Sequence, residues 1–219
     1  HHLHESPWTM TVPLMALAAL STVGGFLGFP GKLFGAPQLN WIEHVLEPAI
    51  DGVPAATVAH EVALKNADLI ATTFGPTGLH DVPGHEEIEI GLVKLYRVTG
   101  EQKYLDLAEF FIRERGHDSG RALFGDYAQD HIPVSEQSEA VGHAVRAGYL
   151  YAGVADVAAL TGDEALIAAI GRIWDDVVSH KLYLTGGIGA RRRGEAFGDA
   201  YELPNAVAYT ETCAAIANI

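Results

Sequence analysis

The sequence contains a single cysteine among its 219 residues, which excludes an intrachain disulfide and a zinc site built from four of its own cysteines. Basic residues are also scarce: 14 Lys and Arg stand against 28 Asp and Glu, giving a formal net charge of −14. Such a chain repels a phosphate backbone, so no nucleic-acid partner is expected. Because 48% of the residues are hydrophobic and 9% are aromatic, a disordered protein is excluded as well.

Charge is missing above all from the start of the chain. Residues 1–50 carry four charged residues, and residues 6–31 carry none. A helix of this length and character can span the hydrocarbon core of a bilayer, whereas its alternative is a buried helix of a folded domain. We expect the first, an N-terminal hydrophobic, transmembrane-like helix that contacts a membrane through residues 6–31. The chain is accordingly divided into a segment 1–50 and a domain 51–219.

Three motifs in the first segment carry a resemblance to a known family. They are HESPWTMTVPL at residues 4–14, GGFLG at residues 24–28 and IEHVLEP at residues 42–48. Over about residues 2–50 they resemble a late transmembrane segment of the antiporter-like L subunit of NADH-quinone oxidoreductase. Since one span cannot translocate protons, the resemblance implies a natural fusion, an assembly artefact or a membrane-anchored remnant of that respiratory subunit.

Helical periodicity dominates residues 51–219. Helices are predicted at 57–75, 92–98, 103–112, 138–160 and 165–178. Two pairs of helices are joined by the same turn, Thr99-Gly100-Glu101 and Thr161-Gly162-Asp163, in which glycine ends the first helix. A helix–turn–helix unit used twice indicates stacked hairpins, in a solenoid or in a closed toroid. Because strand signals are few, the predicted fold class is all-α.

The loops and helix starts of these hairpins carry three polar clusters that are candidate sites. The first is Gly84-His85-Glu86-Glu87, whose alternative is a solvated helix start with acids that favour the helix dipole. The second contains Glu136, Glu139 and His143, whose spacing predicts one shared helix face. An imidazole beside a carboxylate can be held in one tautomer and point at a substrate hydroxyl, or it can form an ordinary surface pair.

The third cluster ends with Glu211 and Cys213. A carboxylate and a thiolate are half of a competent set of zinc ligands, whereas the alternative is an inert buried cysteine beside a solvated glutamate. The glycines upstream, Gly186, Gly187 and Gly189, do not form a nucleotide-binding loop, because three arginines follow them instead of Lys-Ser or Lys-Thr.

Motifs from all three clusters carry a second resemblance and occur in order along residues 58–219. They include HEEIE at 85–89, EAVGHAVRA at 139–147, TGGIG at 185–189, GEAF at 194–197, YELPN at 201–205 and ETCAA at 211–215. This set resembles the β-L-arabinofuranosidase family, glycoside hydrolase family 127. The resemblance implies a carbohydrate substrate and an (α/α)6-barrel, a toroid of helical hairpins of which this chain supplies an incomplete part.

The same resemblance implies roles for five residues. Glu195 matches the general acid/base. Glu211 and Cys213 match two ligands of a Zn2+ ion. His85 and His143 match histidines that bind the substrate. The implied enzyme is a zinc-dependent retaining hydrolase of non-reducing-end β-L-arabinofuranosides or similar sugars, whose nucleophile is a zinc-bound cysteine beyond residue 219.

Because that nucleophile is not in this sequence, we expect a fragment with little activity by itself. The alternatives are a catalytically inactive helical-toroid binding module and the respiratory-subunit remnant. Missing hairpins would leave apolar helix faces uncovered, which favours association, including homo-oligomers. No targeting signal decides the localisation; the catalytic part is assigned to the cytoplasm, with membrane association through residues 6–31.

Overall fold

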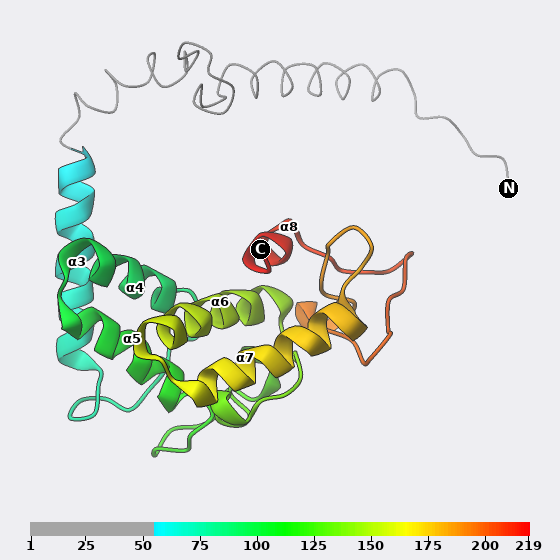
Figure 1. Cartoon of the computed structure of the whole chain (residues 1–219), viewed down its shortest axis with the longest axis horizontal. Coiled ribbons are helices and arrows are strands. Elements are labelled where there is room, and N and C mark those ends of the chain that lie inside the picture. Colours follow the sequence, from blue (N-terminus) through cyan, green and yellow to red (C-terminus); the bar gives the residue numbers. More distant parts are fainter. Residues whose placement is uncertain (1–54) are drawn as a thin grey trace, which may run out of the picture. The chain divides into compact units, whose positions relative to one another are not determined.

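The structure is a computed structural model that describes residues 55–219, and this part of the chain is mostly helical (Figure 1). Its α-helices are α3 (Ala55–Thr73), α4 (Ile88–Thr99), α5 (Gln102–Glu114), α6 (Ala144–Thr161), α7 (Glu164–Asp176) and α8 (Thr212–Ala217). Over the described range there is no β-strand, only isolated bridges, which agrees with the predicted all-α class. The predicted hydrophobic helix at 6–31 and the whole of segment 1–50 lie outside the described residues.

Short helical turns punctuate the loops between the longer helices. Three are 3₁₀ turns, η2 (Asp126–Ala128), η3 (Val134–Glu136) and η5 (Arg193–Glu195), and η4 (Val177–Lys181) is a π-helical extension of α7. Between residues 55 and 219 no helix has the length and apolar character needed to cross a membrane.

The two Thr-Gly-acid turns are built in the same way, as predicted. Gly100 and Gly162 both adopt left-handed backbone angles, with φ of 73° and 70°, and each N–H donates to the carbonyl four residues earlier. The hydroxyls of Thr99 and Thr161 also donate to carbonyls four residues earlier, at 2.7 and 2.9 Å. Asp163 then caps α7 by accepting two backbone N–H groups of its first turn. Each turn therefore closes one helix and starts the next within three residues.

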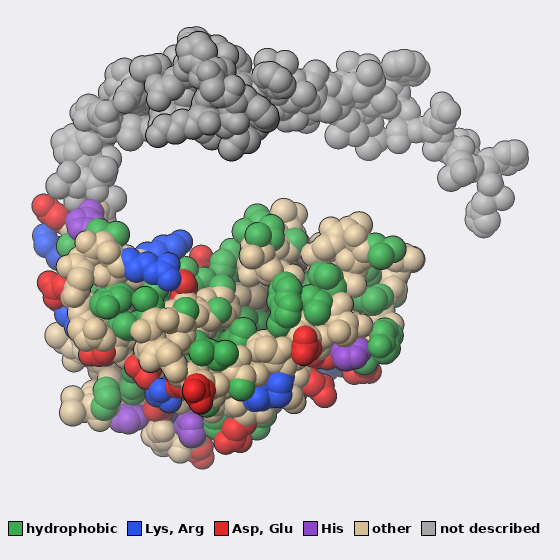
Figure 2. Space-filling view, viewed as in Figure 1, with side chains coloured by type: hydrophobic (Ala, Val, Ile, Leu, Met, Phe, Trp, Pro, Cys, Tyr) green, Lys and Arg blue, Asp and Glu red, His purple; other side chains and the backbone are tan. Residues whose placement is uncertain are grey.

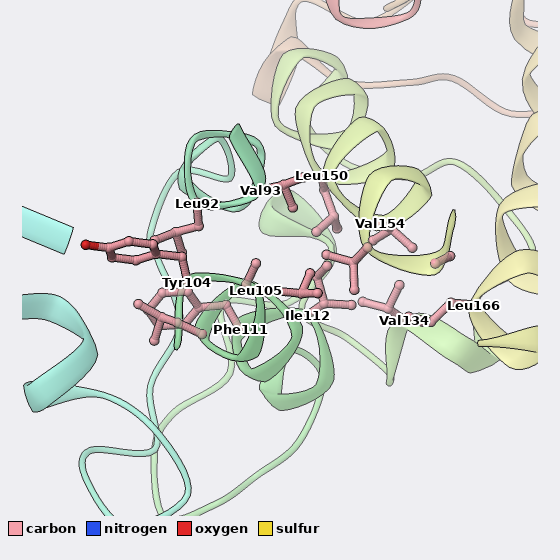
Figure 3. Close-up of a cluster of buried hydrophobic side chains, with 14 of the residues drawn as sticks. Leu92, Val93, Tyr104, Leu105, Phe111, Ile112, Val134, Leu150, Val154 and Leu166 are labelled. Carbon is pink, nitrogen blue, oxygen red and sulfur yellow. The ribbon is translucent and has the colours of Figure 1, made fainter. Parts of the chain in front are cut away.

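The main hydrophobic core joins α4, α5 and α6, and it belongs to the compact unit Leu64–Ile219 (Figure 3). Helix α4 packs on α5 and α6, and α6 packs in turn on α7 and α8. Burying each large aliphatic or aromatic side chain contributes about 1.5–3 kcal/mol of transfer free energy. The labelled side chains in this core are Leu92, Val93, Tyr104, Leu105, Phe111, Ile112, Val134, Leu150, Val154 and Leu166.

A second core fastens the loops of the third polar cluster to α6. Its members include Ala144 and Ala147 of α6, Ile173 of α7, Phe197 from the loop after η5, and Ala214 of α8. The segment that carries Glu195 is consequently held against the first turns of α6.

The predicted helix 138–160 is wrong at its start, because α6 begins only at Ala144. Gly142 has φ of 71°, and a Cβ at this position would collide with the backbone carbonyl of Asp126. His143 follows with extended backbone angles and is the N-cap of α6. Since Glu136 lies in η3 and His143 precedes α6, the predicted helix face shared by Glu136, Glu139 and His143 does not exist.

Candidate active site

A hydrogen-bonded pair, His143 and Glu195, joins two segments that lie 52 residues apart in the sequence. The Nε2 atom of His143 lies 2.6 Å from Oε2 of Glu195. Backbone pairing holds the two segments together: His143 forms a bridge with Ala196, and Phe197 N–H donates to Gly142 O at 2.9 Å. His143 is only 7% exposed, whereas the Glu195 side chain is 39% exposed. The carboxylate is thus anchored from the protein side and open to a ligand.

The backbone presents Glu195 in a strained conformation. Its φ is 51°, and the preceding Gly194 is also left-handed, with φ of 72°. Reciprocal hydrogen bonds between Arg191 and Ala196, at 3.0 and 2.9 Å, close the turn around them. A non-glycine residue in this region costs about 1–3 kcal/mol, and such strain clusters at functional sites. The left-handed backbone, which Glu195 shares with Gln129 and Tyr201, is thus a feature of Glu195 that does not depend on any motif.

Tyr209 supplies a second donor to the carboxylate. Its hydroxyl lies 3.2 Å from Glu195 Oε1, so each carboxylate oxygen of Glu195 meets one donor. The negative charge of Glu195 and this hydrogen bond raise the pKa of Tyr209, which keeps the hydroxyl protonated and able to donate. Tyr209 lies in the third predicted cluster, but its contact with Glu195 was not predicted, because nothing in their spacing indicates it.

Tyr127 packs against His143, and Arg146 packs in turn on Tyr127. The N–H of His143 donates to the Tyr127 carbonyl at 3.1 Å, and the two rings meet edge to face at 5.4 Å between centroids. The Arg146 guanidinium lies over the Tyr127 ring at 4.9 Å, a cation–π contact. With 46% of Tyr127 exposed, its ring borders the open side of the site. Tyr127 begins the second predicted cluster and Arg146 lies in the motif at 139–147, but no role was predicted for either residue.

The structure brings the predicted His85 beside the predicted His143. Their ring centroids are 6.4 Å apart, and the His85 ring lies 6.3 Å from that of Tyr149. The Nδ1 atom of His85 lies 3.0 Å from the Glu86 carbonyl, which can only accept a hydrogen bond. Nδ1 must then carry the proton, and Nε2 of this exposed side chain is left as an acceptor for a ligand hydroxyl.

Beneath His85, the interpretation as a solvated helix start holds for Glu87 and is wrong for Glu86. Glu87 is exposed, but Glu86 and Glu89 have no exposed surface. Burial raises the pKa of Glu86 to about 7, although the charges of Arg115 and Arg146 oppose the shift. Burial also raises the pKa of Glu89. Glu86 and Glu89 are therefore buried beneath the site and do not line its surface.

Three of the predicted residues could together face a cation. Ligand atoms of His143, Glu195 and Glu211 all lie within 4.8 Å of one another. The Oε2 atom of Glu211 is buried and receives no hydrogen bond from the described residues, which is the state expected of an oxygen that serves a cation. Cys213 is exposed in the first turn of α8 and is not a member of this group. The carboxylate of Glu211 therefore fits a metal ligand.

Comparison with known proteins identifies the class as glycoside hydrolase. The chain belongs to the β-L-arabinofuranosidase family GH127, because the model of that family's catalytic domain matches residues 41–219. The resemblance predicted from the motifs of residues 58–219 is confirmed.

Individual relatives agree with this assignment. The chain is 38% identical over 243 residues to a non-reducing end β-L-arabinofuranosidase of Bifidobacterium longum subsp. longum, covering 94% of this chain and 37% of that protein. It is 56% identical to a solved GH127 β-arabinofuranosidase, with a TM-score of 0.68, over 72% of this chain and 25% of the other. A GH127 β-L-arabinofuranosidase from Geobacillus stearothermophilus T6 gives 44% identity and a TM-score of 0.66, over 70% and 27%.

These matches also bear on the rest of the prediction. The chain spans little more than a third of the curated relative and about a quarter of the two solved structures, whose similarity supports the predicted helical toroid. The resemblance of residues 2–50 to the respiratory L subunit is not supported, since the alignment with the Bifidobacterium enzyme covers 94% of the chain. The division at residue 50 stays a prediction, and the family model begins inside that segment at residue 41.

Proposed function

We propose that this chain carries part of the active site of a retaining hydrolase of non-reducing-end β-L-arabinofuranosides or similar sugars, with Glu195 as the general acid/base. One observation supports this most directly: the partly exposed Glu195 carboxylate is held at its two oxygens by His143 and Tyr209, on a strained turn. The inactive binding module and the respiratory remnant are not favoured, because the chain matches a hydrolase family along most of its length.

Retention needs an acid/base and a nucleophile that flank the glycosidic bond. Glu195 would give a proton to the leaving glycosidic oxygen and later take one from the attacking water. A carboxylate oxygen has two lone pairs, so one donor at each oxygen leaves room for this exchange. His85, with Nε2 free to accept, would bind a sugar hydroxyl. Both ring nitrogens of His143 already have protein partners, so His143, predicted to bind the substrate, would act on the sugar through the carboxylate of Glu195.

Glu211 and Cys213 would hold a Zn2+ ion, with Glu211 contributing its buried oxygen, which no donor among residues 55–219 contacts. When bound, zinc keeps a coordinated thiol deprotonated and therefore nucleophilic. Zinc sites of this kind are tetrahedral, and these two residues supply only half of the ligands. The nucleophile implied by the family resemblance is a further cysteine, so the isolated chain should hydrolyse little substrate.

A chimeric enzyme tests the proposal. Residues 58–219 would replace the matching region of the Geobacillus enzyme, which is 44% identical to this chain. Hydrolysis of a nitrophenyl β-L-arabinofuranoside should be retained in the chimera. The Glu195→Gln substitution should lower kcat by roughly 10²–10⁴-fold, the usual contribution of general acid/base catalysis.

Glu139→Gln is the matched control, because Glu139 is an exposed glutamate close in sequence to His143. It should leave kcat within a factor of two or so of the unsubstituted chimera. Equal rates for Glu195→Gln and Glu139→Gln, in chimeras with the same melting temperature, would refute the role of Glu195.

A further inference from the structure

We infer that His143 is held as its Nε2–H tautomer and is a positioning residue for Glu195, not a ligand of the metal. The role assigned to Glu195 rests on the proposed function, whereas the tautomer follows from local geometry alone.

The first constraint acts on Nδ1. The first N–H groups of a helix have no partner inside the helix, and in α6 the N–H of Arg146 is satisfied by the side chain of the N-cap. It donates to His143 Nδ1 at 3.1 Å. A backbone N–H can only donate, so Nδ1 accepts and carries no proton. In a neutral imidazole the proton must then reside on Nε2.

The second constraint acts on Nε2. This atom lies 2.6 Å from Glu195 Oε2, a distance that suits a donor facing a carboxylate. The opposite tautomer would direct Nδ1–H at the N–H of Arg146 and a lone pair at the carboxylate, so both hydrogen bonds would be lost together. The ring is buried and meets Tyr127 and His85 edge-on, which leaves it little room to reorient.

The tautomer has a consequence for the metal. A histidine that ligates through Nε2 needs its lone pair there, and its Nδ1–H normally donates to a carbonyl or carboxylate. His143 has the reverse arrangement. The ligand atoms of His143, Glu195 and Glu211 lie within 4.8 Å of one another. Because His143 donates its Nε2–H to Glu195, Glu211 is the residue of this group that would bind the cation.

The tautomer can be measured on the full chain. A long-range ¹H–¹⁵N correlation spectrum of ¹⁵N-labelled protein distinguishes a protonated from an unprotonated ring nitrogen, and the His143→Asn variant assigns the signals. We expect a protonated Nε2 and an unprotonated Nδ1, without zinc and in the presence of excess Zn2+. A protonated Nδ1, or a conversion of Nε2 to a metal-bound nitrogen on adding Zn2+, would overturn the inference.

Two substitutions separate positioning from structural support. In His143→Asn the side-chain oxygen can still cap α6, but the side chain has no atom at the place of Nε2. In His143→Leu both contacts are lost. We expect a melting temperature close to that of the unsubstituted protein for the asparagine variant and a clearly lower one for leucine.

The readout for positioning is the ¹³C signal of the Glu195 side-chain carboxyl group, assigned with Glu195→Gln. We expect this signal to shift in His143→Asn although the fold is retained. An unchanged carboxyl signal in that variant would show that His143 only caps the helix. Absence of hydrolysis in the chimeric enzyme, with the Nε2–H tautomer and the carboxyl shift both observed, would refute the proposed function and leave the geometric inference intact.

Discussion

Glu86 and Arg115 form an ion pair in which neither side chain is exposed, with Arg115 Nη1 2.8 Å from Glu86 Oε1. Arg115 also donates to the carbonyls of Ala128 and Pro83, at 2.8 and 2.9 Å. The pair thus connects the two loops that border the candidate active site. A buried ion pair of this kind is costly to break from one side, because the remaining charge has no replacement partner.

Glu86 should make the stability of the protein depend on pH. Burial raises its pKa to about 7 in the folded state, against 4.5 for an ordinary glutamate. As the pH rises between these values, the unfolded chain releases a proton that the folded chain retains, so the free energy of unfolding falls, by roughly 3 kcal/mol at most. Above pH 7 the loss is complete. Urea unfolding at pH 4.5, 6 and 8 measures this decline.

The Glu86→Gln variant provides the comparison for that decline. It lacks the titrating group, so its free energy of unfolding should fall less between pH 4.5 and 7 than that of the unsubstituted protein. Some decline should persist, because the pKa of the buried Glu89 is also raised. Parallel curves for the two proteins would contradict the assignment of the effect to Glu86.

Gly142 should be intolerant of any side chain. Its left-handed φ is unfavourable for other residues, and an added Cβ would meet Asp126 O and approach Gln129 Nε2 to 2.9 Å. Gly142→Ala should lower the free energy of unfolding by about 2 kcal/mol or more. Gly171→Ala in α7 is the control: nothing lies within 4 Å of the added Cβ, and alanine favours the helix by up to ~1 kcal/mol. If Gly142→Ala were as stable as the unsubstituted protein, as is expected of Gly171→Ala, the loop would accommodate the methyl group and the prediction would be wrong.

Zinc binding should depend on Glu211 and Cys213. We expect the chain to bind Zn2+ weakly, and either Glu211→Gln or Cys213→Ser to weaken binding by roughly tenfold or more, because each removes one of few ligands. Competition with a chromophoric chelator measures the affinity. Glu139→Gln, which changes an exposed glutamate, should bind zinc as the unsubstituted chain does. Equal affinities for all four proteins would exclude this pair as ligands.

Apolar surface on α7 and α8 should drive self-association. A cavity of about 200 Å³ between α6, α7 and the end of α8 has mainly apolar walls, including Ile173 and Trp174. Trp174 and Ile216 are 52% and 60% exposed, and hydrophobic side chains gather over these helices in Figure 2. Light scattering after gel filtration should find species larger than a monomer, shifted towards monomer by Trp174→Lys. Leu79→Lys, at an equally exposed leucine outside these helices, should not produce the shift.

The hairpin turns could be predicted from the sequence because their determinants are local. Gly100 and Gly162 supply the left-handed caps, and each is followed at once by the N-cap residue of the next helix. The start of α6 could not be predicted, since apolar periodicity continues upstream of Ala144. What prevents a helix there is the close approach of Gly142 to Asp126, a contact that depends on the tertiary fold.

The candidate site, too, could be predicted only in part from the sequence. Family resemblance pointed to His143 and Glu195, but their mutual hydrogen bond follows from a bridge between distant segments that no spacing rule describes. The roles of Tyr209 and Arg146 were not predicted because they consist of contacts with those two side chains. The alternation of polar and apolar residues reports on burial and carries no information about which polar groups meet.

The bridge between His143 and Ala196 has a consequence for how the protein folds. It closes a loop that contains both α6 and α7, and closing a long loop costs more chain entropy than forming the hairpin inside it. The hairpin should form first and the pairing of His143 with Glu195 last. During synthesis on the ribosome, α6 and α7 can therefore form before the segment that pairs with His143 has left the ribosome. A helical circular dichroism signal therefore reports only that the helices have formed. A probe at Glu195 is needed to show that Glu195 has paired with His143.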